Sequence, residues 1–399
     1  MKILVACDMP EAMLAALRAL GTEVTHCPRA TGDELKLAVK DAAILIVGRA
    51  RVSPEIIAAA PVLQMIVRRG SGVSNIALED ASREGVFVTH CPGREAAAVA
   101  ELGLGLIVAL DRGLVEQAHG LRDGDPLDGG RIGQGLVGRT LGVYNYDAVG
   151  IELASRAQSF GMKVTALAPG LAADPTLSAP GLDFYAWPRE LARQSDVIFV
   201  HAPPDESEET WIDGDFLSHA RRAALLVHIG RPSAIDPEAL ASAVEQKQLR
   251  VAIDILSFDP SRDAARFKWR LLDLPGVIAT HRLATRTCQA REATAAEAVE
   301  VVRRYLVSGE VRNCVNLAER SPATWQLVLR LRDTVGVMAS VMDAIRADGI
   351  NAEEITCRVF SGAQAAWCVI SLDERPSTES LAAIGAIPGV IHLELRAVV

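Results

Sequence analysis

The sequence predicts an α/β protein with two doubly wound parallel sheets, followed by a smaller C-terminal domain of ferredoxin-like topology. Short apolar runs alternate with helical patterns over most of the 399 residues. This alternation is typical of parallel sheets that helices cover on both faces. The runs form two series, and an apolar helix that begins near Ala96 lies between them. From about Trp325 the order becomes strand, helix, strand, strand, helix, strand, which is the ferredoxin-like pattern.

Each expected element follows from a short run of apolar residues or from a helical repeat. The expected strands of the two sheets are residues 2–6, 42–48, 63–69 and 86–90, and then 140–146, 163–169, 196–202, 224–230, 251–256 and 277–281. In the C-terminal part the strands are expected at 326–332, 351–360, 365–373 and 390–398, and the helices at 335–349 and 377–387. The polar segment 310–324, which contains Pro322, is the expected linker.

Composition restricts the class of protein. Hydrophobic residues make up 50% and charged residues 23%, which is typical of a globular chain. The net charge of −9 argues against nucleic acid or an anionic membrane as the main partner. The apolar helix near Ala96 is too short to span a bilayer, and the N-terminus lacks the long apolar region of a signal peptide.

Seven cysteines are present, an odd number, and none has C-x-x-C spacing. We expect reduced thiols in a cytoplasmic protein, with no disulfide framework and no metal site.

Residues 141–154, LGVYNYDAVGIELA, combine a strand, a tight turn and a helix. A dinucleotide-binding protein carries G-x-G-x-x-G at such a place. Only the third glycine, Gly150, is present, and it would let the helix pack closely on the strand. Asn145 replaces the first glycine, and we expect it to take the left-handed conformation that asparagine tolerates.

Asp147 replaces the second glycine, where the backbone should come closest to a pyrophosphate. It adds a side chain and a negative charge at the N-terminus of a helix, which favours an anion. We expect its carboxylate to cap the helix from within. Such a cap stabilises the protein without cofactor and opposes cofactor binding.

Several segments together resemble the D-2-hydroxyacid dehydrogenases, in particular D-3-phosphoglycerate dehydrogenases with a C-terminal ACT domain. These segments are residues 48–88, 98–110, 153–164, 195–203, 228–240, 251–260 and 333–351. The resemblance implies a flavodoxin-like substrate domain (1–95 with 290–315), a Rossmann-like nucleotide domain (96–289) and an ACT-like domain (320–399). It also implies a homodimer or homotetramer.

The family oxidises a small D-2-hydroxy acid with NAD, and 3-phosphoglycerate is the first candidate substrate. By resemblance, Arg231 binds and polarises the substrate, because a guanidinium stays charged and grips a carboxylate in two places. His281 acts as the acid/base, and Asp259 orients it, although the family has a longer glutamate there. The alternatives are a surface arginine in a loop and a structural histidine.

Other cofactor positions also follow from the resemblance. Asp254 matches the aspartate that faces the nicotinamide, its alternative being a turn aspartate, and His201 lies among the cofactor-binding residues. Ala168 stands where the family has an aspartate for the ribose hydroxyls. Glu95 replaces a polar residue near the substrate.

On the substrate side, Arg49 and Arg51 resemble the arginine pair that meets the anionic substrate. A solvated loop is the alternative for Arg51. Ser71 and Gly72 match the loop that holds the substrate carboxylate through its backbone amides, with Arg69 beside it.

In the ACT-like domain, Asn351 and Asp333 match two effector positions, and Leu331 fills a third that is usually polar. A dimerisation module without a ligand is the alternative to a serine sensor.

Two functions follow from this pattern. One is an NAD-dependent dehydrogenase with weakened cofactor binding. The other is a pseudoenzyme of the same family that has lost NAD and acts as an anion-binding or regulatory module.

Overall fold

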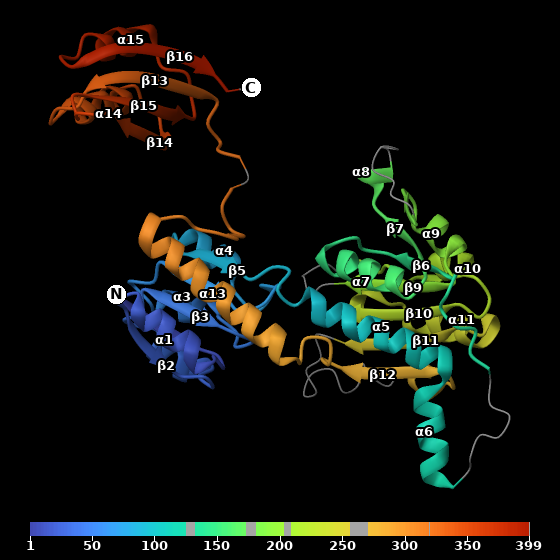
Figure 1. Cartoon of the computed structure of the whole chain (residues 1–399). Helices are drawn as coiled ribbons and strands as arrows, with labels where there is room; N and C mark the ends of the chain where they lie inside the picture. Colours follow the sequence, from blue (N-terminus) through green and yellow to red (C-terminus); the bar gives the residue numbers. More distant parts are fainter. Residues whose placement is uncertain (125–131, 173–180, 203–208, 256–269, 319, 399) are drawn as a thin grey trace. The chain divides into compact units, whose positions relative to one another are not determined.

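The computed structural model describes residues 1–124, 132–172, 181–202, 209–255, 270–318 and 320–398 (Figure 1). The chain divides into two compact units, Met1–Asn316 and Leu317–Val399. The first unit contains two parallel sheets and the second an antiparallel sheet, so the predicted α/β fold class is confirmed.

The first sheet has five parallel strands in the order β2-β1-β3-β4-β5. Its strands are β1 (Lys2–Ala6), β2 (Glu23–His26), β3 (Ile44–Val47), β4 (Met65–Arg68) and β5 (Phe87–His90). The helices between them are α1 (Glu11–Ala19), α2 (Gly32–Ala38), α3 (Pro54–Ala58) and α4 (Leu78–Arg83). The sequence did not predict β2, because this edge strand has only one aliphatic residue and is never fully buried.

Helix α13 (Cys288–Ser308) returns from the far end of the unit to complete this lobe. Its residues Ala295, Ala298 and Val301 share one apolar core with residues of β1, β3 and β4. The five-stranded lobe is therefore built from two separate parts of the chain, as the resemblance implied. The exact boundaries of the predicted domains stay predictions.

The second sheet has seven parallel strands in the order β12-β11-β10-β9-β6-β7-β8. Its strands are β6 (Thr140–Val143), β7 (Lys163–Leu167), β8 (Leu182–Tyr185), β9 (Val197–Ala202), β10 (Leu225–Gly230), β11 (Arg250–Ile255) and β12 (Val277–His281). The helices are α5 (Ala96–Arg112), α6 (Leu114–Asp123), α7 (Ala148–Ser159), α8 (Pro169–Ala172), α9 (Pro188–Gln194), α10 (Gly214–His219) and α11 (Pro237–Lys247), with 3-10 turns η2 (Pro232–Ala234) and η3 (Arg270–Asp273).

Both faces of the large sheet are buried, because helices α5 and α7 cover one face and α10 and α11 the other (Figure 1). The close packing is visible at Gly103 of α5, where a Cβ atom would lie 2.7 Å from the ring of Phe199. Strand β6 ends at Val143, earlier than predicted, because the backbone turns at Tyr144. β8 was not predicted, and its pattern is only half-buried.

The second unit has the order β14-β15-β13-β16, with all neighbouring strands antiparallel. Its elements are β13 (Trp325–Arg332), α14 (Val337–Ala347), β14 (Ala352–Val359), β15 (Ala365–Leu372), α15 (Thr378–Gly385) and β16 (Val390–Ala397). This is the predicted ferredoxin-like order. Leu327, Leu329 and Leu331 of β13 point into its core.

The expectation that all cysteines are reduced is wrong for one pair. Cys357 of β14 and Cys368 of β15 face each other in the strand register and form a disulfide. Their separation of 11 residues matches no motif, so only the hairpin register shows that their side chains meet. Cys7, Cys27, Cys91, Cys288 and Cys314 are free.

Among the described residues, no helix has the length and apolarity to cross a membrane. The same part of the chain contains no group of three or more His, Cys, Asp or Glu side chains arranged to hold a metal ion.

The disulfide is open to a direct test by thiol counting. Under denaturing conditions without reductant, 5,5′-dithiobis(2-nitrobenzoate) should react with the five free cysteines, and after reduction with all seven. A Cys357→Ser variant leaves Cys368 without its partner, so it should show six reactive thiols both before and after reduction. Seven reactive thiols before reduction would contradict the pairing.

Candidate active site

The candidate site lies at the carboxyl edge of the seven-stranded sheet. From β6 the chain first builds outward through β7 and β8, and then from β9 outward in the other direction through β12. The point where the strand order reverses is therefore between β6 and β9, and ligands of open parallel sheets bind in the crevice at such a point. The turn 144–147 follows β6, His201 lies near the end of β9, and Arg231 follows β10.

Asp147 caps helix α7 from within, as predicted from the sequence. One carboxylate oxygen, Oδ1, accepts hydrogen bonds from the backbone amides of Val149 (2.9 Å) and Gly150 (3.0 Å). The other, Oδ2, accepts from His201 Nδ1 (2.8 Å) and from the side-chain amide of Asn145 (3.3 Å). Both oxygens are thus engaged inside the protein, at the place where a helix N-terminus favours an anion.

Asn145 does not play the predicted part. It is absent from the residues with positive φ, so the turn does not use a left-handed asparagine. Its side-chain amide instead donates to Asp147 and, at 3.4 Å, to the carbonyl of His201. Gly150 does keep its predicted role, because a Cβ atom there would lie 2.5 Å from the carbonyl oxygen of Asn145.

Burial by itself raises the pKa of the Asp147 carboxyl. The hydrogen bond and charge of His201, together with the amides of Gly150 and Val149, outweigh burial, so that the pKa lies below its ordinary value of 3.8. Asp147 is therefore ionised at neutral pH and holds a negative charge at the start of α7.

Arg231 is almost completely buried, with 2% of its surface exposed. Its Nη1 donates to the carbonyl of Glu209 (2.8 Å) and to the hydroxyl of Ser233 (3.2 Å). Its guanidinium carbon lies 4.9 Å from the ring centre of Trp211. Arg231 is therefore not the surface arginine of the alternative interpretation. It is a buried cation, held by hydrogen bonds, close to the strand ends where the sheet order reverses.

Two features of β10 fix the backbone at Arg231. A Cβ atom on Gly230 would lie 1.9 Å from the carbonyl oxygen of Ala202, so only glycine fits between the strand ends. The fully buried His228 donates from Nε2 to the carbonyl of Arg231 (3.1 Å). Burial lowers the pKa of His228 to about 3, so this imidazole is neutral under ordinary conditions.

His281 is the exposed last residue of β12, in register with Ile255 of β11. Asp254 is fully buried in β11 and does not lie in a turn. Its carboxylate accepts from the hydroxyl of Thr280 (2.7 Å) and from the amides of Leu283 and Ala284 (3.0 Å each). Asp254 thus anchors the loop that follows His281. Asp259, the predicted partner of His281, lies outside the described residues.

On the five-stranded lobe, Ser71 and Glu95 come together. The Ser71 hydroxyl donates to Glu95 Oε2 (3.2 Å), and His90 Nδ1 donates to the Ser71 carbonyl (2.6 Å). Gly72 follows in the same half-buried loop. A carboxylate of the protein therefore reaches the loop predicted to hold the carboxylate of a substrate.

Arg68, which the sequence analysis did not single out, lies beside this loop at the end of β4. Burial is the main reason why its pKa is lowered; the charge of Glu95 opposes that change and the charge of Arg49 adds to it. A Cβ atom on Gly70 would lie 1.5 Å from Arg68 Nη1, so the glycine makes room for the guanidinium. A charged residue ending a buried parallel strand was the signal available in the sequence.

The other predicted cations on this lobe are Arg49, Arg51 and Arg69. Arg49 and Arg51 are both exposed. The pKa of Glu55 is lowered mainly by a hydrogen bond from Ser53, and the positive charge of Arg51 lowers it further. Arg69 Nη1 donates to the carbonyl of Arg291 in α13 (3.3 Å).

The turn 144–147, which was predicted to hold the cofactor, does not fit a pyrophosphate in this conformation. The Asp147 carboxylate already accepts the backbone amides at the N-terminus of α7. Ala168 follows β7 and offers no side chain for a ribose; its amide donates to the carbonyl of Tyr185. Gly150 fits the family pattern. A dinucleotide would need Asp147 to leave the amides of Val149 and Gly150.

The two predicted effector residues do not meet within one chain. Asp333 precedes α14 and Asn351 follows it, so the length of this helix separates them. Asn351 donates to Asp373 and Glu353. Leu331 is a core residue, which explains why it is apolar.

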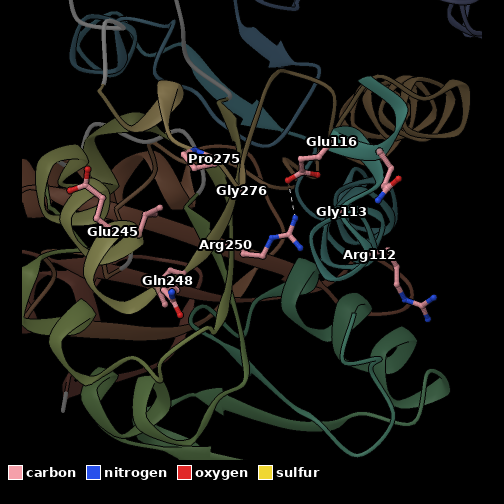
Figure 2. A pocket seen from close by; sticks show the side chains of 11 residues that line it. Arg112, Gly113, Glu116, Glu245, Gln248, Arg250, Pro275 and Gly276 are labelled. Atoms are coloured by element: carbon pink, nitrogen blue, oxygen red, sulfur yellow. Dashed lines mark hydrogen bonds and ion pairs between the residues drawn. The ribbon is translucent and has the colours of Figure 1, made fainter. Parts of the chain in front are cut away.

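A hollow of about 460 Å³ lies at the opposite, amino edge of the large sheet (Figure 2). Arg250 at the start of β11 pairs there with Glu116 of α6 (2.8 Å). Since ligands of parallel sheets bind at the carboxyl edge, we assign the active site by topology and not to this hollow.

Comparison with known proteins identifies the family. Residues 104–284 match the family model described as D-isomer specific 2-hydroxyacid dehydrogenase, NAD binding domain. A hydroxypyruvate reductase from Thermotoga maritima is 32% identical over 276 residues, which are 69% of this chain and 88% of that protein. The chain belongs to the D-2-hydroxyacid dehydrogenase family. The resemblance inferred from the sequence is confirmed.

Other proteins are similar over more of this chain. A D-3-phosphoglycerate dehydrogenase from Methanocaldococcus jannaschii is 30% identical over 79% of this chain, but the match spans only 59% of that protein. Among solved structures, the TT0316 protein from Thermus thermophilus is 29% identical, with a TM-score of 0.65, and the match covers 79% of this chain and 100% of that one.

The cap on α7 has a measurable effect on stability. Asp147→Ala should lower the free energy of unfolding by about 1 kcal/mol near neutral pH. Because native contacts hold the pKa of Asp147 below 3.8, the charged cap stabilises the fold above that ordinary pKa, and this stabilisation is lost as the pH falls through the lower native pKa.

Urea unfolding of wild type and variant between neutral pH and about pH 3 measures the effect. Asp147→Asn is the matched control, since asparagine caps a helix but does not titrate. A wild-type advantage over Asp147→Ala that stays constant down to the lowest pH would contradict the assignment.

Proposed function

We propose that this protein is an oxidoreductase that acts on a small D-2-hydroxy acid, or on the corresponding 2-oxo acid, with NAD as the redox partner. The first candidate substrate is 3-phosphoglycerate, as in serine biosynthesis, and the second is hydroxypyruvate. The observation that carries the proposal is Arg231, a buried and oriented guanidinium next to the point where the sheet order reverses. Membership of the family supports the same reaction class.

The roles follow from the chemistry of the side chains. Arg231 would bind the substrate carboxylate and polarise the adjacent C–O bond. His281 would take the hydroxyl proton in oxidation and return it in reduction. Asp254 would keep His281 in place through the loop it anchors, and Asp259 would orient the imidazole. NAD, when bound, supplies the hydride acceptor.

The arginines of the five-stranded lobe favour a substrate with a second anionic group. The charge of Arg49 acts on Arg68 beside the Ser71 loop, and the carboxylate of Glu95 opposes it. Arginine suits phosphate because its planar donors contact two oxygens. The presence of these arginines on one lobe, in a chain with a net charge of −9, is the reason to rank 3-phosphoglycerate first.

A second function is favoured by the cap at α7. Asp147 occupies the backbone amides that would bind the pyrophosphate of NAD. The protein would then be an anion-binding or regulatory module that does not bind NAD. In that case Arg231 and the arginines of the five-stranded lobe would still bind a small anion. The ACT-like unit would serve in self-association.

Two experiments decide between these functions. NADH is titrated into the full-length protein by fluorescence and by calorimetry, and turnover is measured with hydroxypyruvate plus NADH and with 3-phosphoglycerate plus NAD. Saturable binding with turnover supports the dehydrogenase. Absence of binding at millimolar NADH rejects it in favour of the module.

The turn itself gives a sharper prediction. Asp147→Gly combined with Asn145→Gly should strengthen NADH binding by about tenfold. The double variant frees the backbone amides of Val149 and Gly150 and removes a negative charge. Asp236→Gly is the matched control, since Asp236 caps α11 through the amides of Glu238 and Ala239. It should cost stability without changing NADH affinity. No gain from the double variant would refute this account of the turn.

A further inference from the structure

Three residues from separate parts of the chain meet around the reversal point of the large sheet. Tyr144 is the first residue after β6, and its amide donates to the carbonyl of Phe199 in β9 (2.9 Å). Arg231 follows β10, and its amide donates to Ala202 at the end of β9 (2.9 Å). Trp211 precedes α10, and its amide donates to Ala234 (3.0 Å). Each residue is thus held by its backbone before its side chain is considered.

The Trp211 indole contacts both of the other side chains. Its ring is nearly parallel to that of Tyr144, with ring centres 5.3 Å apart and an angle of 11° between the planes. The Arg231 guanidinium carbon lies 4.9 Å from the indole centre. Phe216 of α10 meets Tyr144 edge-on, at 5.4 Å and 70°. The indole is therefore packed in one orientation.

This arrangement provides what a buried guanidinium needs. A guanidinium is a permanent cation in proteins, so burying one requires groups that stabilise its charge in place. Glu209 and Ser233 accept from Nη1, and the electron-rich face of an indole attracts a cation, more strongly where water is excluded. The contact also limits the orientations open to the plane of the guanidinium.

We propose that Trp211, backed by Tyr144, is a positioning residue that fixes the Arg231 guanidinium for a small planar carboxylate. This role rests on the proposed function, in which Arg231 binds the substrate carboxylate. It adds that the aromatic pair of Trp211 and Tyr144 sets the orientation of Arg231. Tyr144 belongs to the same turn as Asp147, so the aromatic pair also connects the cofactor turn with the substrate arginine.

Oxalate is the probe for this arrangement, because it presents the planar carboxylate of a 2-oxo acid without undergoing reaction. It is titrated into the full-length protein by calorimetry. Trp211→Met, which keeps an apolar side chain but loses the ring, should weaken oxalate binding by about 5- to 30-fold. Trp211→Phe, which keeps an aromatic face, should stay within about threefold of wild type.

Trp187→Met is the matched control. Trp187 is 58% exposed and carries a similar contact, with Arg189 at 5.7 Å, away from the reversal point. It should bind oxalate as wild type does. Tyr144→Leu loosens the support of Trp211 without touching Arg231 and should weaken oxalate binding by about 2- to 5-fold. It keeps the test decisive if Trp211→Met does not fold by circular dichroism.

The outcomes separate this inference from the proposed function. Oxalate binding that is unchanged in Trp211→Met, equal in the Phe and Met variants, or absent in wild type overturns the positioning role, whatever the turnover assay gives. Weaker oxalate binding in Trp211→Met with restoration in Trp211→Phe supports it, even if no NADH binds. Where turnover is present, Trp211→Met should raise KM for hydroxypyruvate more than it lowers kcat.

Discussion

The parallel order of the strands in both sheets of the described part of Met1–Asn316 is the constraint on which the rest of this unit depends. Parallel strands need a crossover after each strand, so helices cover both faces and leave little room for charged side chains within the sheet. Polar groups therefore collect at the carboxyl edge, where the strands end. Arg68, His201, Arg231 and His281 all lie at or next to such ends. The strand order reverses between β6 and β9, which is where ligands of open parallel sheets bind.

Acidic side chains of the protein itself occupy positions around this edge. Asp147 fills the N-terminus of α7, Glu95 accepts from Ser71, and Asp254 binds the loop after His281. A buried carboxylate without hydrogen-bond donors would be costly, and each of these has donors within the fold. The same contacts that stabilise the protein alone compete with anionic ligands, because ligand and side chain need the same donors. The affinity for an anion is then a difference between two sets of similar hydrogen bonds.

The arginine at the centre of the site has the opposite requirement. A guanidinium keeps its charge, so its burial depends on acceptors and on the face of an aromatic ring. Trp211 supplies that face only because the segment before α10 pairs with the segment after η2, through the bridge of Ile212 with Ile235. The orientation of Arg231 is thus decided by contacts between segments far apart in the chain.

The sequence by itself determined the alternation of strands and helices, the ferredoxin-like order after Trp325 and the capping of α7 by Asp147. Each of these depends on residues close together in the chain, through apolar periodicity or through the reach of one side chain to the next turn of helix. Only the tertiary structure decided the contacts that depend on strand order and register. The sequence could not reveal that Cys357 faces Cys368, that Asn145 donates to Asp147 and to His201 instead of turning left-handed, or that Trp211 lies against Arg231. The turn interpretation of Asp254 stayed open for the same reason, since its partners Leu283 and Ala284 come from the loop after the next strand. Local patterns fix which element a residue belongs to, whereas the packing of whole elements fixes which side chains meet.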